Sequence, residues 1–342
     1  MTAVLSEKQA PPVSATRRGL VVLVLAIALA LASVASTFLG SQRISVDEVW
    51  SGLTTGAGDP GAIVQGMRIP RTLIGLAVGA ALGIAGALIQ GFTRNPLADP
   101  GILGVNAGAS LGVTIGVAFF GVTAASGYIW FAFAGAIVAT VLVYLIGSAG
   151  RTAPDPMRMT LSGVALGAVM GGAVAAIGLL NPRVFDSIRS WNAGSLSALT
   201  PDVYAVVPFL LTGLVLAFAL APSLNALALG DDLATALGSR VILTRVLSIL
   251  AVTLLCGAAT AAAGPIAFVG LMVPHAVRWF VGPHQGWILL GTVFAAPLLL
   301  LTADVVGRLV LRTGELPVSV VTALIGAPVL IALVRRKKVS GL

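Results

Sequence analysis

Ten long apolar runs constrain this chain more than any other feature of its sequence. A helix needs about 20 apolar residues to cross the hydrocarbon core of a bilayer. The pattern predicts an all-α polytopic membrane protein with about ten transmembrane helices. The third and eighth runs are short and broken by Gly or Pro, so nine or eleven spans stay open. The runs lie near residues 20–39, 72–91, 102–120, 128–148, 159–180, 203–222, 241–263, 266–281, 287–303 and 316–334.

The composition agrees with a membrane protein. Only 9% of the 342 residues are charged, whereas a soluble globular protein carries about 25%. Arg17 and Arg18 precede the first run, as in a secretory signal, but the run is long for a signal core and we expect a first span. The predicted organisation is a disordered cytoplasmic N-terminus (1–19), a ten-helix transmembrane domain (20–334) and a basic cytoplasmic tail (335–342).

The distribution of Lys and Arg over the loops predicts the orientation. With ten spans and the N-terminus inside, the inner segments hold 13 of the 20 basic residues, and both termini are cytoplasmic. The formal net charge of +8 then belongs to the inner face. Because the basic residues are dispersed over many loops, the positive-inside bias explains them better than nucleic-acid binding does, and we expect a bilayer and no nucleic acid.

Glycine spacing and chain breaks suggest how the helices pack. Lipid gives helices no hydrophobic reason to associate, so small residues that let backbones approach must supply the contact. A break also follows the second and the seventh runs at the same interval, because Pro96 lies 24 residues after Thr72 and Pro265 lies 24 after Val241. Runs of opposite direction with matching breaks indicate inverted repeats. The predicted contact rows are Gly75, Gly79 and Gly83; Gly104, Gly108, Gly112 and Gly116; and Gly163, Gly167 and Gly171.

Residue patterns that support catalysis or metal binding are scarce. His275 and His284 lack the spacing of metal ligands, and Cys256, the only cysteine, lies in an apolar run. The three lysines lie near the chain ends and none follows a glycine, which excludes a phosphate-binding loop. We therefore expect no catalytic residue, bound metal or cofactor, and an energy source on a partner protein.

Four segments of the chain carry long motifs, namely RIPRTLIGLAVGAALGIAGALIQGFTRNPLADPGILGVNAGA (68–108), ALGDDLATALG (228–238), GPIAFVGLMVPHAVR (264–278) and ADVVGRLVLRTGELPVSVVTALIGAPVLIALV (303–334). They resemble the permease family of bacterial ABC importers for iron-siderophores, haem and vitamin B12, and the resemblance runs from about residue 20 to the C-terminus. It implies a type II importer permease of ten helices in the plasma membrane, with the pathway at a dimer interface between two permeases of the same or different sequence. It also implies two cytoplasmic ABC ATPases that use ATP and Mg²⁺, and an external substrate-binding protein.

The resemblance places the ATPase-coupling segment at 223–240, the longest inner segment between spans. We expect two short helices around Gly230, with Asp231 and Asp232 capping the second. Leu237 and Gly238 are expected to contact the ATPase. The alternative is a plain surface loop.

The resemblance also places a cytoplasmic gate in the inner turn FTRNPLADP, at Asn95, Pro96 and Leu97. Polar backbone at this depth is tolerated where it lines a pathway. A plain structural turn is the alternative, because Asn-Pro initiates turns wherever it occurs. The other inner turn departs from the family at Pro156 and Met157, where relatives often place small hydroxyl residues, so no second gate is assigned.

Arg68, Arg71 and Arg308 are the residues implied in docking the substrate-binding protein at the outer face. Anchoring of helix ends at the lipid headgroups is the alternative reading.

The predicted function is the permease subunit of an ATP-driven importer for a ferric siderophore, with haem and a corrinoid as alternative cargoes. A secondary carrier or channel that works without ATP is the competing class. An intramembrane enzyme is disfavoured because the sequence offers no paired nucleophile and base.

Overall fold

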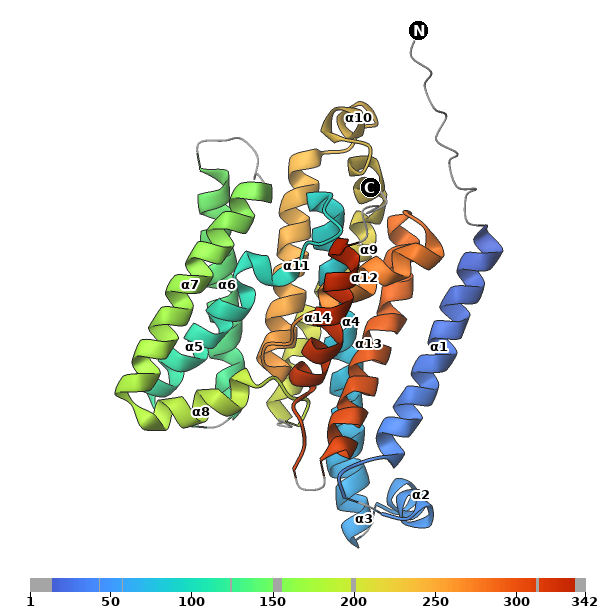
Figure 1. Cartoon of the computed structure of the whole chain (residues 1–342), viewed down its shortest axis with the longest axis vertical. Coiled ribbons are helices and arrows are strands. Elements are labelled where there is room, and N and C mark those ends of the chain that lie inside the picture. The colour runs from blue at the N-terminus through green and yellow to red at the C-terminus, as the bar shows by residue number, and fades with distance from the viewer. Residues whose placement is uncertain are drawn as a thin grey trace.

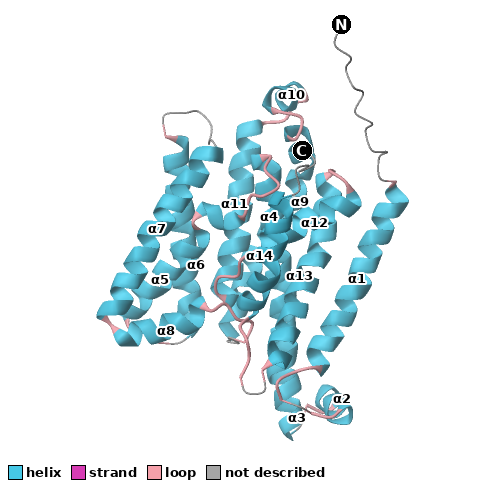
Figure 2. Cartoon of the chain, viewed as in Figure 1, coloured by secondary structure: helices cyan, strands magenta, loops and turns pink. Residues whose placement is uncertain are grey.

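The computed structural model of the chain describes residues 14–42, 44–56, 58–123, 125–149, 156–197, 201–311 and 314–335. These residues form helices, turns and loops, as Figure 2 shows. One helix corresponds to each predicted span, which confirms the prediction of about ten. The ten are α1 (Ala15–Phe38), α4 (Ile69–Thr93), α5 (Val105–Phe120), α6 (Ala125–Ser148), α7 (Pro156–Leu180), α9 (Val207–Leu227), α11 (Val241–Ala263), α12 (Val269–Val281), α13 (Gln285–Val310) and α14 (Val318–Arg335).

The described part of the chain has seven helices that are long and apolar enough to cross a membrane. The helices α5 and α12, which occupy the third and eighth runs, are among the shorter apolar ones. Their shortness follows from the sequence, because breaks at residues 94–104 and 264–268 consume part of each run. The helix α13 is longer than the predicted run 287–303, and it therefore contains Asp304 and Arg308.

The short elements distinguish the two ends of the bundle (Figure 1). One end, called here the α10 end, carries α10 (Asp231–Ala236), the start of α1 and the end of α4. The other, the α8 end, carries α8 (Pro182–Asn192), α2 (Val46–Thr54) and α3 (Gly58–Ile63). A π-helix, η1 (Val64–Arg68), leads from α3 directly into α4, and 3₁₀ turns occupy Pro100–Leu103 (η2) and Pro201–Val206 (η3).

The helix α4 is the centre of the bundle and contacts α9, α11, α12 and α13. Its glycine row forms the contact with α13, as predicted. A Cβ atom at Gly79 would lie 2.5 Å from the Cα atom of Pro297, and one at Gly83 would collide with the side chain of Ala296. The glycines thus bring the two helices closer than any larger side chain would allow.

The second glycine row forms the contact between α5 and α6. Cβ atoms at Gly108 and Gly112 would collide with the carbonyl oxygens of Gly135 and Phe131. The third row, on α7, is packed only at its first member, where Gly163 meets the carbonyl of Ile102. A Cβ atom at Gly171 would meet nothing within 4 Å among the described residues. Most of this face of α7 is therefore uncovered in the single chain.

The helices α4 and α11 run in opposite directions side by side, and each is followed by a break and a short helix (Figure 1). Each break holds a non-glycine residue in the left-handed region, Arg94 at φ 53° and Phe268 at φ 70°. This arrangement is what inverted repeats predict. The two halves also meet closely, because a Cβ atom at Gly86 would collide with the carbonyl oxygen of Gly270.

Candidate functional site

The turn after α4 is built by its own sequence. Pro96 lacks a backbone N–H and disfavours a helical backbone at Asn95, so the helix ends at Thr93. Arg94 occupies the C-cap in the left-handed conformation. The Oδ1 atom of Asn95 accepts a hydrogen bond of 3.0 Å from the N–H of Leu97. Asn95 is exposed, and Pro96 and Leu97 are half-buried, at the α10 end of the bundle. The predicted gate residues therefore form one accessible turn, while their role as a gate stays a prediction.

Gln90 fixes this turn to the second break of the chain. Its buried side-chain amide donates to the carbonyl oxygens of Ala98 at 3.4 Å, Gly270 at 3.3 Å and Leu271 at 3.0 Å. The first acceptor belongs to the turn, and the other two belong to the first residues of α12. A single side chain thus connects the segments that interrupt the two halves.

The predicted coupling segment contains one short helix rather than two. Residues before Gly230 continue α9 as far as Leu227, and Pro222 is accommodated inside that helix. The second helix, α10, is present, but Gly230 occupies its N-cap position without a side-chain hydrogen bond. Asp231 and Asp232 lie in its first turn, where the helix dipole favours carboxylates, so their predicted capping is wrong.

The helix α10 and the residues on either side of it present leucines to solvent at the end of the bundle. Leu229, Leu233 and Leu237 are 59%, 56% and 65% exposed, whereas Ala234 is fully buried against the bundle. Gly238, at φ 83°, ends the segment in a conformation that favours glycine. An apolar row beyond the end of α9 and α11 lies outside the spans, which is where an exposed patch indicates a protein partner.

Asp231 joins the turn after α4 to the coupling segment. Its carboxylate lies 3.2 Å from the Nη2 atom of Arg94 and 2.9 Å from the Nη2 atom of Arg245. Arg94 belongs to the turn, and Arg245 is a buried residue of α11. Neither arginine has a role that the sequence predicts, because a cation near the end of a span is common in membrane proteins.

The three arginines predicted to dock a binding protein lie together at the α8 end, and all three are buried. Arg68 donates to the backbone carbonyls of Thr37, Phe38 and Gln42. Arg71 and Arg308 lie 2.7 and 2.6 Å from the carboxylate of Asp304. Docking through these residues stays a prediction, and their burial means that direct contact with a partner requires them to leave this cluster.

Glu315 completes the cluster from the loop before α14. It accepts from Arg71 at 2.6 Å and from Ser41 at 2.6 Å. Partial burial alone would raise the pKa of Glu315, but these hydrogen bonds and the charges of Arg71 and Arg308 hold it below its ordinary value. The cluster thus ties together α1, α4, α13 and the loop before α14.

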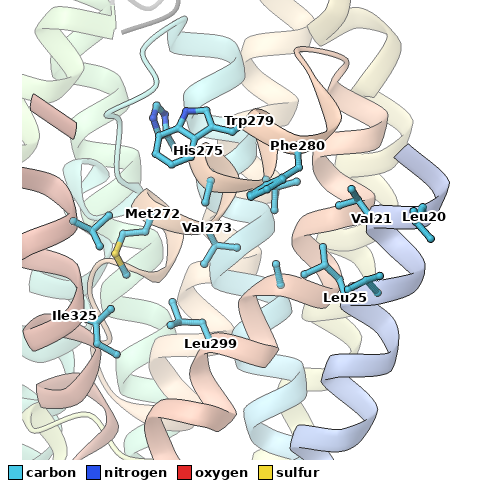
Figure 3. Close-up of a pocket in the computed structure, with 15 residues that line it drawn as sticks. Leu20, Val21, Leu25, Met272, Val273, His275, Trp279, Phe280, Leu299 and Ile325 are labelled. Carbon is cyan, nitrogen blue, oxygen red and sulfur yellow. The ribbon is translucent and has the colours of Figure 1, made fainter. Parts of the chain in front are cut away.

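A large hollow lies away from these sites, between α1, α12, α13 and α14 (Figure 3). Its volume is about 580 Å³, and its lining is almost wholly apolar. Figure 3 shows Leu25, Val273 and Leu299 along its length, with His275 and Trp279 toward one end. Because it lies between the spans, an apolar lining is what contact with lipid requires.

Several predictions concern residues outside the described ranges. The N-terminal segment and the basic tail are described only from residue 14 and up to residue 335, and the other inner turn is described only from Pro156. The basic residues outside the described ranges are Lys8, Arg43, Arg151, Arg312, Arg336, Lys337 and Lys338.

The described arginines are distributed unequally between the two ends of the bundle, with eight at the α10 end and five at the α8 end.

Comparison with known proteins agrees with this architecture. The model of the FecCD transport family matches residues 25–336. The ferric enterobactin transport system permease protein FepD of Escherichia coli K12 is 50% identical over 332 residues, which cover 96% of this chain and 98% of FepD. The Fe(3+)-citrate import system permease protein YfmD of Bacillus subtilis 168 is 42% identical over 275 residues, covering 80% of this chain and 81% of YfmD.

A solved structure shares the fold along almost the whole chain. It is described as an inward-facing transporter of the metal-chelate ABC type, and it superposes with a TM-score of 0.81 at 28% sequence identity. The match covers 93% of this chain and 99% of the other. With its ten matching helices and its family match over most of the sequence, this chain belongs to the FecCD transport family and is an ABC importer permease.

Proposed function

We propose that this chain is a permease subunit of a ferric-siderophore importer, driven by two partner ATPases that bind at its α10 end. The observation that carries the proposal is the row of exposed leucines on and beside α10, which are Leu229, Leu233 and Leu237. These side chains lie beyond the ends of the spans, where lipid tails do not cover them, and next to the turn after α4. An ATPase surface that covers them is placed to act on that turn.

The cargo is proposed from the relatives. FepD is a ferric enterobactin permease and YfmD a Fe(3+)-citrate permease, so iron chelates are the substrate class shared by these two similar proteins. We propose a ferric siderophore for this chain, with haem and a corrinoid as outcomes of the same test. The external binding protein selects the cargo before this chain meets it.

A second permease is proposed to pack against the uncovered face of α7. Among the described residues, a Cβ atom at Gly167 would lie 3.9 Å from the Cβ atom of Ala107 and would meet nothing closer. Cβ atoms at Gly171 and Gly172 would meet nothing within 4 Å. Open glycines on a membrane helix suit the close approach of another helix. The pathway then runs between the two subunits, with two copies of Asn95, Pro96 and Leu97 at its inner end.

The α10 end is proposed to face the cytoplasm, together with both termini. The excess of described arginines at that end supports this orientation by the positive-inside rule. At the opposite end, we propose that Arg68, Arg71 and Arg308 assist docking of the binding protein by holding the loops around Ser41 and Glu315, because their own guanidinium groups are buried.

Transport by the reconstituted complex tests the proposal. The permease, the partner ATPase and the binding protein are placed in proteoliposomes, and uptake of ⁵⁵Fe-labelled siderophore, labelled haem and labelled corrinoid is measured with ATP. We expect uptake of the siderophore alone, and none with a hydrolysis-dead ATPase. Uptake that persists with the dead ATPase would show a secondary carrier, and uptake of haem or corrinoid alone would reassign the cargo.

A further inference from the structure

We propose that Asp231 is an ionic strut between the coupling helix and the gate, through which displacement of α10 moves the turn at Asn95, Pro96 and Leu97. The strut has two parts, a half-exposed pair with Arg94 and a mostly buried pair with Arg245. This inference rests on the proposed function, because it assigns a connection between two sites whose roles that function supplies.

The geometry restricts how α10 can move without the turn. Asp231 is the first residue of α10, and its Oδ1 atom lies 3.2 Å from the Nη2 atom of Arg94. Arg94 directly precedes Asn95, and its left-handed backbone conformation, at φ 53°, turns the chain out of α4 at this point. A Cβ atom at Gly230 would lie 3.8 Å from the Nη1 atom of Arg94, so the guanidinium also lies against the backbone that begins α10.

The pair with Arg245 explains why the carboxylate stays in place. The side chain of Arg245 is only 8% exposed, and both oxygens of Asp231 accept from its Nη2 atom, at 3.1 and 2.9 Å. A buried cation that lacks a counter-charge is costly, so Asp231 is held firmly to α11. The pair with Arg94 has side chains that are 39% and 42% exposed, and it is therefore weak enough to break and re-form.

The ion pair of Asp231 with Arg245 of α11 therefore persists, whereas its ion pair with Arg94 beside the gate can break and re-form. An ATPase that displaces α10 moves it together with this end of α11, because Asp231 joins the two helices through Arg245. The carboxylate then pulls on Arg94, which is bonded covalently to Asn95. Gln90 limits how far the motion spreads, because it fixes Ala98 to the start of α12. The stretch from Arg94 to Leu97 lies between α4 and this fixed point, so it is the part of the turn that the pull reaches first.

The test removes only the labile pair. Arg94→Gln keeps a long polar side chain without the charge, Arg94→Lys restores the charge, and Arg17→Gln removes an exposed charge elsewhere at the α10 end as the matched control. Asp231 is left unchanged so that Arg245 keeps its partner. Each variant is assembled with the binding protein and ATPase in proteoliposomes, and siderophore uptake per ATP hydrolysed is measured.

We expect Arg94→Gln to lower uptake per ATP about two- to fivefold, the range that an exposed ion pair can supply. Arg94→Lys should restore most of the loss, and Arg17→Gln should match the unmodified chain. A purely structural role for Arg94 would instead lower the amount of folded complex and leave uptake per ATP unchanged. An unchanged ratio in Arg94→Gln overturns the strut.

Crosslinking separates failure of the strut from failure of the gate. With Cys256→Ser as background, Leu97→Cys is crosslinked to its counterpart in the nucleotide-free, ATP-bound and ADP-bound states. We expect the yield to follow the nucleotide with Arg94 present and to stop following it with Arg94→Gln. A yield that still follows the nucleotide in Arg94→Gln overturns the strut and leaves the gate intact. If the yield never changes with Arg94 present, the gate assignment at this turn is wrong, and the strut that acts on it is overturned with it.

Discussion

The two charged clusters of this permease differ in ways that match different tasks. At the α8 end, Asp304 is 1% exposed and bridges two buried arginines, while Arg68 is saturated by backbone carbonyls. At the α10 end, Asp231 is half-buried and shared between a buried and a half-exposed arginine. The first cluster is built to hold four segments in one arrangement. The second has one partner that can be released, which suits a region that changes shape.

The largest effect is expected from breaking the cluster at the α8 end. Asp304→Asn removes the carboxylate that compensates Arg71 and Arg308, leaving two buried cations short of a partner. Removing one member of a buried ion pair costs about 3–5 kcal/mol. We expect the midpoint of thermal unfolding, measured in detergent, to fall by a large amount. Asp232→Asn, which neutralises an exposed carboxylate on α10, is the matched control and should leave the midpoint unchanged.

A charge on the exposed face of α10 should affect coupling and leave stability unaffected. Leu237→Arg places a cation in the row proposed to enter the ATPase, and Leu237 already lies 65% exposed, so the fold loses little. We expect uptake to fall at least about tenfold, the effect of about 1.4 kcal/mol, with normal insertion and an unchanged unfolding midpoint. Leu237 is a better site than Gly238, whose φ of 83° strains any larger residue. Normal stimulation of the ATPase together with normal uptake would show that the coupling assignment is wrong.

A larger side chain on the open glycine face of α7 should weaken assembly of the permease dimer without affecting the fold of the single chain. A Cβ atom at Gly171 would meet nothing within 4 Å among the described residues, so Gly171→Leu should not change the stability of the isolated subunit. It should nevertheless weaken assembly of the permease dimer, which size-exclusion chromatography with light scattering measures. Gly79→Leu is the contrasting variant, because Gly79 faces Pro297 inside the chain and its replacement should prevent folding itself. Equal dimer yields for Gly171→Leu and the unmodified protein would move the interface elsewhere.

The smallest effect concerns the pH dependence of the α8 cluster. The pKa of Glu315 is lowered in the folded chain, so its carboxylate contributes stability that is present above the unfolded value of 4.5 and is lost as the pH falls through the lower folded value. Glu315 is partly exposed, and we expect this contribution to be below about 1 kcal/mol. Glu315→Gln should flatten the decline of the unfolding midpoint below pH about 4.5. An identical decline in both proteins would show that Glu315 does not contribute.

The sequence predicted the spans well because length and hydropathy alone fix them. Spacing by four defines one face of a helix, and it predicted three glycine contact rows, of which the rows on α4 and α5 form contacts within the chain. It could not show that the row on α7 would stay open, because that depends on a second chain. The separate short helix predicted before Gly230 is also wrong, because α9 continues through Pro222 as far as Leu227.

The charged clusters lay beyond local sequence reasoning for a different reason. Arg71 and Asp304 are 233 residues apart, and only the packing of α4 on α13 brings them together. The sequence showed Arg68, Arg71, Asp304 and Arg308 near span ends, which fits an exposed docking surface as well as a buried pair. The burial of the side chains distinguishes a docking surface from a buried ion pair, and burial depends on how the helices pack.

Distances between spin labels during the ATP cycle test the central contrast most directly. In the assembled complex with Cys256→Ser, one label pair joins Leu97 to Arg17 across the α10 end, and another joins Leu39 to Leu311 beside the α8 cluster. The account predicts that binding of ATP shifts the first distance distribution and leaves the second unchanged. A second pair that shifts while the first stays fixed would contradict the assignment of a mobile gate at Asn95, Pro96 and Leu97 and a static cluster at the opposite end.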